Sequence, residues 1–362
     1  MRLRYGNRGE LAQIAACLPR TGIHRILVCR SIKSLGSSLL LTPLLQELGK
    51  YYPGAEIDVV TRSPVAQDIY GAYFSVSGII RLPKAPLSHP LQTMRALSEM
   101  KRIHYDLVID PDPDSQSGRF LALRANATWS LGFVGPNKSG TVTHGIVLPE
   151  ESRHRAKFPV VLLRSAIGDG ISDEPCPPID IRLSAIERRR GRAALAGLTA
   201  DRSDSGKHKP CIGIFANATG PKRLGHAWWI RFLDAFEPQV TDHALVEILP
   251  AFGESLLDSR YPGYFSSDLR KLASVIGALD FYISADCGIM HLACAAGTPT
   301  AGIFTVTDVG EWGPYGDTNH AIDARSLAPE QAAQRVWGAL KCLGASKSRS
   351  IPIDFAGKAA CG

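Results

Sequence analysis

Short apolar runs alternate with helical patterns along most of this 362-residue chain, and this alternation limits its fold more than any other feature. The runs of the first half that favour strands are 25–30, 56–61, 78–81 and 106–110. Helical patterns over 39–50 and 90–102 lie between them. Continuous apolar strands separated by helices are typical of a parallel sheet that is covered on both faces. We therefore expect a doubly wound α/β layer in the first half.

The second half repeats this order after a segment that is rich in proline and glycine. That segment, 168–178, holds three prolines and two glycines, so we expect an interdomain linker over 169–178. We expect strands at 179–183, 211–215, 244–249, 281–283 and 300–304, and helices at 185–198, 226–236, 268–276 and 289–296. The sequence therefore predicts two Rossmann-like α/β domains that face each other across a cleft.

The expected domain boundaries lie at the breaks in this pattern. We expect an N-terminal extension over 1–22, a first domain over 23–168 and a second domain over 179–328. A helical pattern follows over 329–345, and the sequence leaves open whether this helix packs back on the first domain. We expect the tail 346–362, with its Ser, Lys, Gly and Ala residues, to be frayed.

Charge and composition narrow the class of partner. Hydrophobic residues make up 45% of the chain and charged residues 21%, which is ordinary for a globular protein. The net charge of +7 favours an acidic partner, such as nucleic acid, anionic lipid or a phosphorylated substrate. The densest basic cluster, 187–192, is typical of a solvated helix face, and the sequence has no zinc-finger spacing or aromatic-basic RNA signature. We therefore expect no nucleic-acid partner.

Three features bear on the cellular location. No apolar run approaches the roughly 20 residues of a membrane-spanning helix, so we expect a soluble or peripheral protein. The apolar run 11–18 is interrupted by Gln13 and flanked by Arg8 and Glu10, which favours a helical extension over a signal peptide. The eight cysteines are scattered and form no CxxC pair, so we expect reduced thiols. The expected location is the cytoplasm, with peripheral contact at the inner membrane as a further option.

A strand-to-helix turn in the second half is the strongest candidate for a binding site. Asp286, Cys287 and Gly288 lie between the apolar run 281–283 and a helical pattern that Gly297 ends. Backbone N–H groups at the start of a helix bind phosphate well, and Gly288 lets a ligand approach closely. Asp286 is placed to accept hydrogen bonds from sugar hydroxyls. The alternative is that Asp286 only caps the helix.

Two further loops follow strands of the same predicted sheet. One contains Thr219 and Lys222, whose hydroxyl and ammonium groups suit a diphosphate, although a basic surface loop is the alternative. The other places Glu254 to bind ribose hydroxyls and Phe252 to pack near a base, with an ordinary turn as the alternative. Because parallel strands end at one edge, the three loops together favour a nucleotide-sugar diphosphate. His291, on the first turn of the helix, is expected to support this site.

Other nucleotide motifs are incomplete. The chain contains no full GxGxxG and no GxxxxGK[ST], which argues against a dinucleotide dehydrogenase and against a P-loop NTPase. The polar run 306–316 is placed to cover the base or the ribose, or else its aromatic residues pack under a loop.

Several of these motifs resemble those of a known family. The matching stretches are DCGIMHLA at 286–293, 297–299, 307–308 and 312–316 in the second half, and 25–28, 35–43, 52–55, 105–110 and 131–133 in the first. Together they resemble glycosyltransferase family 9, the ADP-heptose:lipopolysaccharide heptosyltransferases. The resemblance covers roughly residues 24–320. It implies a GT-B fold with the acceptor on the first domain and ADP-heptose on the second, and inverting transfer that needs no metal or other cofactor.

The resemblance also implies roles for individual residues. Lys222, with Trp229 after it, looks like the lysine that binds the donor phosphates, and Glu254 looks like the glutamate that binds the ribose. The turn 286–288 looks like an Asp-Thr-Gly that meets the sugar and the diphosphate. Cys287 therefore stands in place of a threonine and leaves only a weak side-chain donor, while its backbone N–H is retained.

One position departs from the family. Active members have an aspartate after the Leu35-Gly36 pair that serves as general base for the acceptor hydroxyl, and this chain has Ser37 there. An unassisted serine accepts no proton near neutral pH, and loss of a general base typically removes about 10²–10⁴ of rate. Either water or a phosphate takes the proton, or the protein is a weak or inactive relative, or another carboxylate replaces the base, namely Asp110, Asp112 or Asp114.

The sequence thus predicts a glycosyltransferase that moves heptose or a related sugar from an ADP-sugar to an anionic acceptor of lipopolysaccharide type. Lys222 and the helix start at Gly288 are expected to stabilise the leaving ADP without a metal. The alternative is a protein that binds nucleotide or glycan without turnover, in which Ser37→Asp changes little. A weaker option is another GT-B enzyme, such as a sugar epimerase.

Overall fold

The computed structural model describes residues 17–169, 174–199 and 209–349, and its side chains up to residue 343. Most of the expected extension 1–22, part of the linker and the end of the tail therefore lie outside the described residues. The elements of the first domain are β1 (Arg25–Arg30), α1 (Leu35–Leu39), α2 (Thr42–Tyr51), β2 (Glu56–Thr61), α3 (Ala66–Tyr70), β3 (Val76–Arg81), α4 (Pro90–Arg102), β4 (His104–Asp110), α5 (Gln116–Ala122), β5 (Asn126–Val134), β6 (His144–Val147) and α6 (Phe158–Ala166). Those of the second are α7 (Ala185–Thr199), β7 (Cys211–Phe215), η1 (Gly220–Lys222), α8 (His226–Phe236), η2 (Glu237–Gln239), β8 (Ala244–Ile248), β9 (Gly263–Tyr264), α9 (Leu269–Ile276), β10 (Phe281–Ala285), α10 (Gly288–Ala296), β11 (Thr300–Phe304), α11 (Val309–Trp312), β12 (His320–Asp323) and α12 (Pro329–Arg349).

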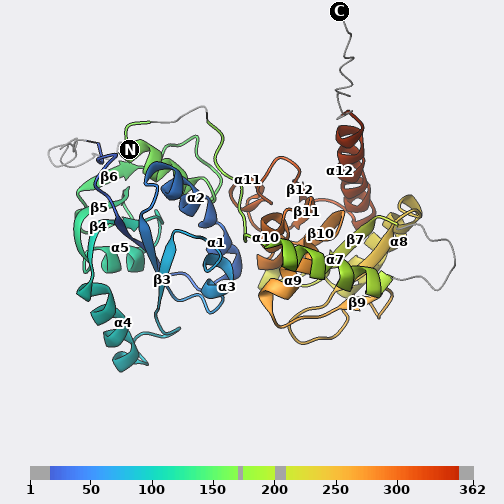
Figure 1. Cartoon of the computed structure of the whole chain (residues 1–362). Coiled ribbons are helices and arrows are strands. Elements are labelled where there is room, and N and C mark those ends of the chain that lie inside the picture. Colours follow the sequence, from blue (N-terminus) through green and yellow to red (C-terminus); the bar gives the residue numbers. More distant parts are fainter. Residues whose placement is uncertain (1–16, 170–173, 200–208, 350–362) are drawn as a thin grey trace, which may run out of the picture.

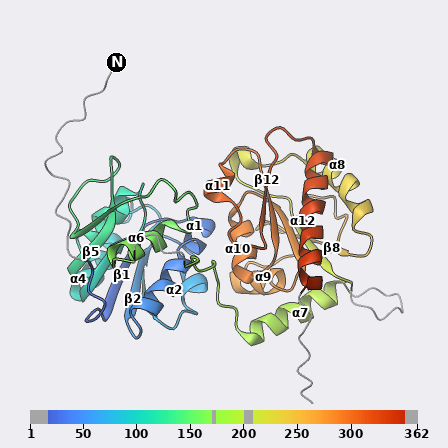
Figure 2. The same cartoon turned by 90° about the horizontal axis from the view of Figure 1, so that it is seen from above.

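Each domain is built on one six-stranded sheet, and the two domains lie side by side (Figures 1 and 2). The first sheet has the order β3-β2-β1-β4-β5-β6 and the second the order β12-β11-β10-β7-β8-β9. All of the neighbouring strands run parallel. Parallel neighbours need crossover connections, and the crossovers carry the helices that cover the sheets. The predicted α/β class with two doubly wound domains is therefore confirmed.

Helices cover both faces of each sheet. In the first domain α4 and α5 pack against one face, while α2 and α6 pack against the other. In the second domain α9 and α10 cover one face, and α8 and α12 cover the other. The helix whose position the sequence left open, α12, packs against α8 of its own domain.

The helix expected over 39–50 begins three residues later, as α2 at Thr42 with Pro43 in its first turn, and an unexpected short helix, α1, precedes it and ends at Leu39. Proline fits the first turn of a helix because that position needs no backbone N–H, whereas inside a continuous helix it removes a hydrogen bond. α1 is therefore a separate short helix, and its start lies at the boundary between the domains.

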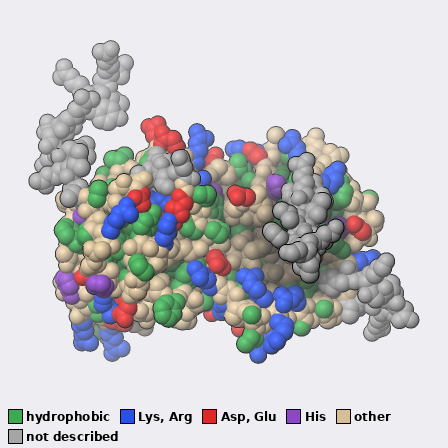
Figure 3. Space-filling model, turned by 45° about the horizontal axis from the view of Figure 1, so that its top comes forward, with side chains coloured by type: hydrophobic (Ala, Val, Ile, Leu, Met, Phe, Trp, Pro, Cys, Tyr) green, Lys and Arg blue, Asp and Glu red, His purple; other side chains and the backbone are tan. Residues whose placement is uncertain are grey.

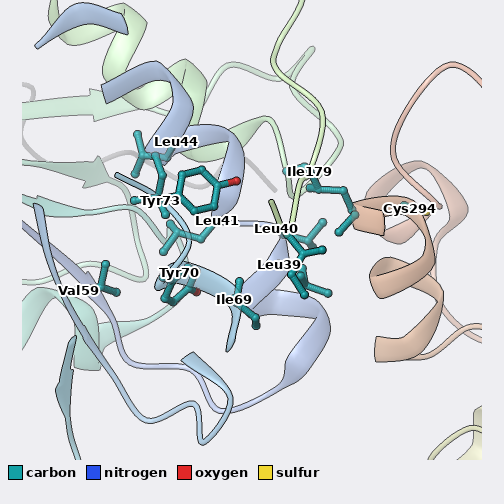
Figure 4. Close-up of a cluster of buried hydrophobic side chains, with 14 of the residues drawn as sticks. Leu39, Leu40, Leu41, Leu44, Val59, Ile69, Tyr70, Tyr73, Ile179 and Cys294 are labelled. Atoms are coloured by element: carbon teal, nitrogen blue, oxygen red, sulfur yellow. The ribbon is translucent and has the colours of Figure 1, made fainter. Parts of the chain in front are cut away.

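The strand expected at 179–183 is wrong, because this segment belongs to neither sheet and Arg182 within it has a left-handed backbone with φ 54°. Its backbone bonds to helices and side chains instead: the Ile181 N–H donates to the Ala295 carbonyl over 3.1 Å, and the Asp180 N–H donates to Thr42 Oγ1 over 3.1 Å. Ile179 lies between residues of α1 and Cys294 of α10 in the buried cluster of Figure 4. The alternation of apolar residues thus reflects an interdomain anchor rather than a strand.

Candidate functional site

A cavity of about 390 Å³ lies between the two domains, at the starts of α1 and α10. The first domain contributes the loop and helix start at 34–37. The second contributes the residues that follow β7 and β10, which are neighbouring parallel strands. The predicted site residues that line it are Ser37, Thr219, Lys222, Asp286, Cys287, Gly288 and His291. The structure therefore brings most of the predicted donor site together with the predicted base position.

Asp286 is held by side chains and does not cap the helix. Its Oδ2 atom lies 2.9 Å from Lys222 Nζ and also accepts a hydrogen bond from Thr307 Oγ1. The residue at the N-cap position of α10 is Cys287. The sequence allowed Asp286 to be either a helix cap or a ligand-binding carboxylate. The geometry favours the second, because Asp286 lines the cavity and is paired with Lys222.

The start of α10 faces the cavity. The first N–H groups of this nine-residue helix carry the positive end of the helix dipole, and those of Ile289 and Met290 lie near the Cys287 thiol, which is only a weak acceptor. Burial raises the pKa of the Cys287 thiol, which therefore stays protonated at neutral pH. The site combines the positive end of a helix with an ammonium group, an arrangement that suits a diphosphate.

His291 is a neutral histidine with an unused hydrogen-bonding atom. Its side chain is buried, and Nδ1 has no partner among the described residues. Burial lowers the pKa of His291 to about 4, and the nearby His154 and Lys222 act in the same direction. A neutral imidazole has one donor and one acceptor nitrogen, so His291 is able to bind a ligand group without adding charge.

Two glycines let the domains approach each other beside the cavity. A Cβ atom on Gly36 would lie 2.7 Å from Cδ2 of His291, and a Cβ on Gly288 would lie 3.1 Å from Cβ of Leu35. Such distances leave no room for a larger residue at position 36 without movement of α1 or α10. The start of α1, with Ser37, is therefore fixed against the start of α10.

A buried arginine that the sequence analysis missed lies behind the wall from the first domain, bonded to Ser37. Arg30 donates from Nη2 to the backbone carbonyl of Ser37 and from Nη1 to Asp112 Oδ2, both over 3.2 Å. Both Arg30 and Asp112 are buried. One signal in the sequence could have identified Arg30: it is a cation at the carboxyl end of a mostly apolar strand. A parallel sheet binds ligands at that edge.

The other two candidate carboxylates lie in different surroundings. Asp110 is fully buried, and its Oδ2 accepts hydrogen bonds from Arg119 Nε over 3.0 Å and Lys138 Nζ over 2.6 Å. Asp110 is thus the centre of a buried ion cluster, and neither Asp110 nor the buried Asp112 lines the cavity. Asp114 binds Arg155 over 2.6 Å.

Three other residues that the sequence analysis singled out, Glu254, Phe252 and Trp229, lie outside the cavity wall. Glu254 and Phe252 are exposed and do not line the cavity. Trp229 is buried in the core between α8 and the sheet. Asn217 and Trp312 line the cavity in addition to the predicted donor residues; Asn217 lies in the loop after β7, and Trp312 ends α11 within the polar run 306–316.

Two properties apply to the part of the chain that the structure describes. It contains no group of three or more His, Cys, Asp or Glu side chains that could hold a metal ion. Its helices are all too short or too polar to cross a membrane.

Comparison with known proteins identifies relatives of this fold. The family model "Glycosyltransferase family 9 (heptosyltransferase)" matches residues 266–340, which include the turn 286–288. This match agrees with the resemblance in the sequence over that part of the chain. A comparison with curated protein sequences found no match.

Three solved structures resemble nearly the whole chain. A glycosyl transferase of family 9 from Veillonella parvula is 18% identical, with a TM-score of 0.70 over 89% of this chain and 97% of that one. The Escherichia coli ADP-heptose lps heptosyltransferase II is 18% identical, with a TM-score of 0.65 over 90% and 99%. The E. coli heptosyltransferase WaaC with ADP is 16% identical, with a TM-score of 0.65 over 87% and 99%. At these identities the similarity establishes the fold, which is the expected GT-B arrangement of two domains.

Proposed function

We propose that the protein is a glycosyltransferase that moves heptose or a related sugar from an ADP-sugar, with inversion, to an anionic acceptor of lipopolysaccharide-core type. The observation that carries this proposal is the pairing of Asp286 with Lys222 at the uncapped start of α10, in a cavity between two domains. The family match over 266–340 and the fold of the heptosyltransferases support it. A cytoplasmic protein at the inner membrane would meet such an acceptor, and nucleic acid has no part in the proposal.

The donor half of the mechanism uses charges that are already in place. The diphosphate binds at the N–H groups of α10, and Lys222 turns from Asp286 toward the phosphate oxygens. Asp286 then accepts hydrogen bonds from the sugar hydroxyls. When the bond between the sugar carbon and the phosphate oxygen breaks, the electron pair leaves with ADP, and Lys222 and the helix start stabilise the added charge. Protein groups supply this stabilisation, and the proposal includes no metal or other cofactor.

The acceptor half needs a group that takes one proton. The acceptor oxygen attacks the sugar carbon, and its proton must leave as the new bond forms. Ser37 stands at the family's base position, and Arg30 bonds both its backbone carbonyl and the Asp112 carboxylate. Arg30 stays charged and relays no proton, and Asp112 does not line the cavity, so the acceptor reaches Asp112 only when the Arg30 side chain moves aside. In the proposed mechanism Asp112, rather than Asp110 or Asp114, then takes the proton directly.

The donor assignment is tested by nucleotide binding. We expect ADP to bind with or without Mg²⁺, and Lys222→Met to weaken binding at least about tenfold, which corresponds to about 1.4 kcal/mol. Lys271→Met removes an exposed lysine of α9 and is the matched control. Indifference of the wild-type protein to ADP, or strict dependence on Mg²⁺, contradicts the proposal.

The transfer assignment is tested with ADP-heptose and a panel of truncated lipopolysaccharide cores. We expect release of ADP and a glycosylated product, with Asp112→Asn lowering the rate by about 10²-fold or more. ADP binding should be unchanged in this variant, and Asp114→Asn should retain activity. Equal rates for Asp112→Asn and wild type would refute the role of Asp112.

The presence of Ser37 favours a second candidate function, a protein that binds nucleotide or glycan without turnover. It predicts ADP binding without any product, and a Ser37→Asp variant that behaves like wild type. Product formation by the wild-type protein on any acceptor of the panel excludes it.

A further inference from the structure

The segment between the end of β3 and the middle of α4 exposes apolar side chains. Leu87 is 97% exposed, Leu91 73% and Met94 66%. The other side of α4 is buried, with Ala96 and Met100 in a cluster beneath the helix. α4 therefore has an apolar face that packs on the sheet and an outer apolar end that protrudes into solvent.

These three side chains are held together by local bonds. Leu91 and Met94 lie three residues apart on one side of the helix. Thr93 Oγ1 donates to the Pro86 carbonyl over 2.9 Å, which fixes the turn that carries Leu87 against the first turns of α4. We call Leu87, Leu91 and Met94 the apolar tip.

The segment that carries the apolar tip is rich in basic residues. The segment 81–102 carries a single acidic residue, Glu99, and five basic ones, Arg81, Lys84, Arg95, Lys101 and Arg102, so that its net charge is 5 − 1 = +4. Within the described residues, none of the five is paired with a carboxylate. Exposed apolar side chains on a segment with unpaired cations are complementary to a bilayer with anionic headgroups. Figure 3 shows another group of basic side chains on the side of the second domain.

The position of the apolar tip suits a membrane-bound acceptor. β3 and β1 are parallel strands of one sheet, so the loop after β3 leaves the same edge as the loop that carries Ser37. Figure 1 shows α4 at the outer corner of the first domain, away from the second domain. A bilayer at this corner leaves the donor domain free.

We propose that the apolar tip and the basic residues of 81–102 form the surface by which the protein docks on an anionic phospholipid bilayer. The leucine and methionine side chains enter the region between headgroups and acyl chains, while the arginine and lysine side chains bind lipid phosphates. The proposed function supplies only the reason for docking, since binding to vesicles requires no donor.

The test is sedimentation with vesicles made of equal parts phosphatidylethanolamine and phosphatidylglycerol, or of phosphatidylcholine alone. We expect binding to the anionic vesicles and at least about tenfold weaker partitioning when Leu87, Leu91 and Met94 are all changed to Ser. Lys84→Glu with Arg95→Glu should have an effect of similar size and should be sensitive to salt.

Two controls make the result specific to this surface. Phe74→Ser removes a fully exposed aromatic residue that precedes β3 and so lies at the opposite edge of the sheet. Arg189→Glu with Arg192→Glu reverses two exposed charges on α7. Both variants should bind vesicles like the wild-type protein.

Several outcomes overturn the proposal: no wild-type binding, equal binding to both kinds of vesicle, or equal losses in the controls. Self-association that the serine variant abolishes, without any change in vesicle binding, assigns the tip to a second copy instead. ADP binding in solution is measured for every variant. If the wild-type protein does not bind ADP, the proposed function is refuted and the docking surface is not affected. The vesicle results support or refute the docking surface and do not bear on the proposed function.

Discussion

Acidification is expected to destabilise the protein through His291. The side chain is 3% exposed, and burial, His154 and Lys222 lower its pKa from 6.5 to about 4. Between these two values the unfolded chain binds a proton that the folded chain does not. The contribution to stability is therefore complete above about pH 6.5 and is lost as the pH falls toward 4. A difference of 6.5 − 4 = 2.5 units corresponds to about 3 kcal/mol.

Urea unfolding measured from pH 4 to pH 8 tests this expectation. His291→Gln removes the titrating group, so its free energy of unfolding should decrease less on acidification than that of the wild-type protein. His226→Gln is the control, because His226 is 55% exposed and pairs with Asp258 at the surface. The lowered pKa of His154 adds an acid-dependent term to all three proteins. Identical pH dependence in the wild type and His291→Gln would show that His291 is not buried as a neutral group.

Three other substitutions concern the packing of the protein, with Gly49→Ala as the control for Gly36→Ala. Gly36→Ala places a Cβ 2.7 Å from the His291 ring and should cost about 1–3 kcal/mol in urea unfolding and weaken ADP binding. Gly49→Ala in α2 meets nothing within 4 Å and should leave stability unchanged or raise it by up to about 1 kcal/mol. Glu47→Gln leaves the buried Arg164 without its carboxylate partner, so we expect a loss of about 3–5 kcal/mol, measured in the same way.

Much of the fold follows from periodicity along the chain. The bounds expected for α4, 90–102, are those of the structure, because its helical pattern is long and begins at a proline. The segment 179–183 was expected to be a strand because its apolar residues alternate. Such alternation indicates that every second side chain is buried, but it does not show whether the backbone pairs with another strand. β5 had no assigned strand because its first half, Asn126 to Trp129, is polar and largely exposed.

The candidate site was predictable where it depends on chain order. Lys222 and Asp286 follow strands of one sheet, and parallel strands end at the same edge, so their approach could be expected. The environment of each carboxylate could not be predicted from chain order. Asp110 and Asp112 are two residues apart at the end of one strand, yet one is enclosed by Arg119 and Lys138 and the other by Arg30. Only the packing around each side chain separates them.

The two walls of the cavity are expected to respond to different substitutions. In the proposed function, ADP binds at the wall from the second domain, where Lys222 and the start of α10 supply positive charge near Asp286. Transfer also requires that the acceptor lose a proton, and the first domain offers Ser37 with Asp112 behind Arg30. Changes at Lys222 should therefore reduce both binding and turnover, while Asp112→Asn should reduce turnover alone. In a protein that only binds nucleotide, changes at Lys222 still weaken binding, but Asp112→Asn has no effect, because no step depends on proton removal.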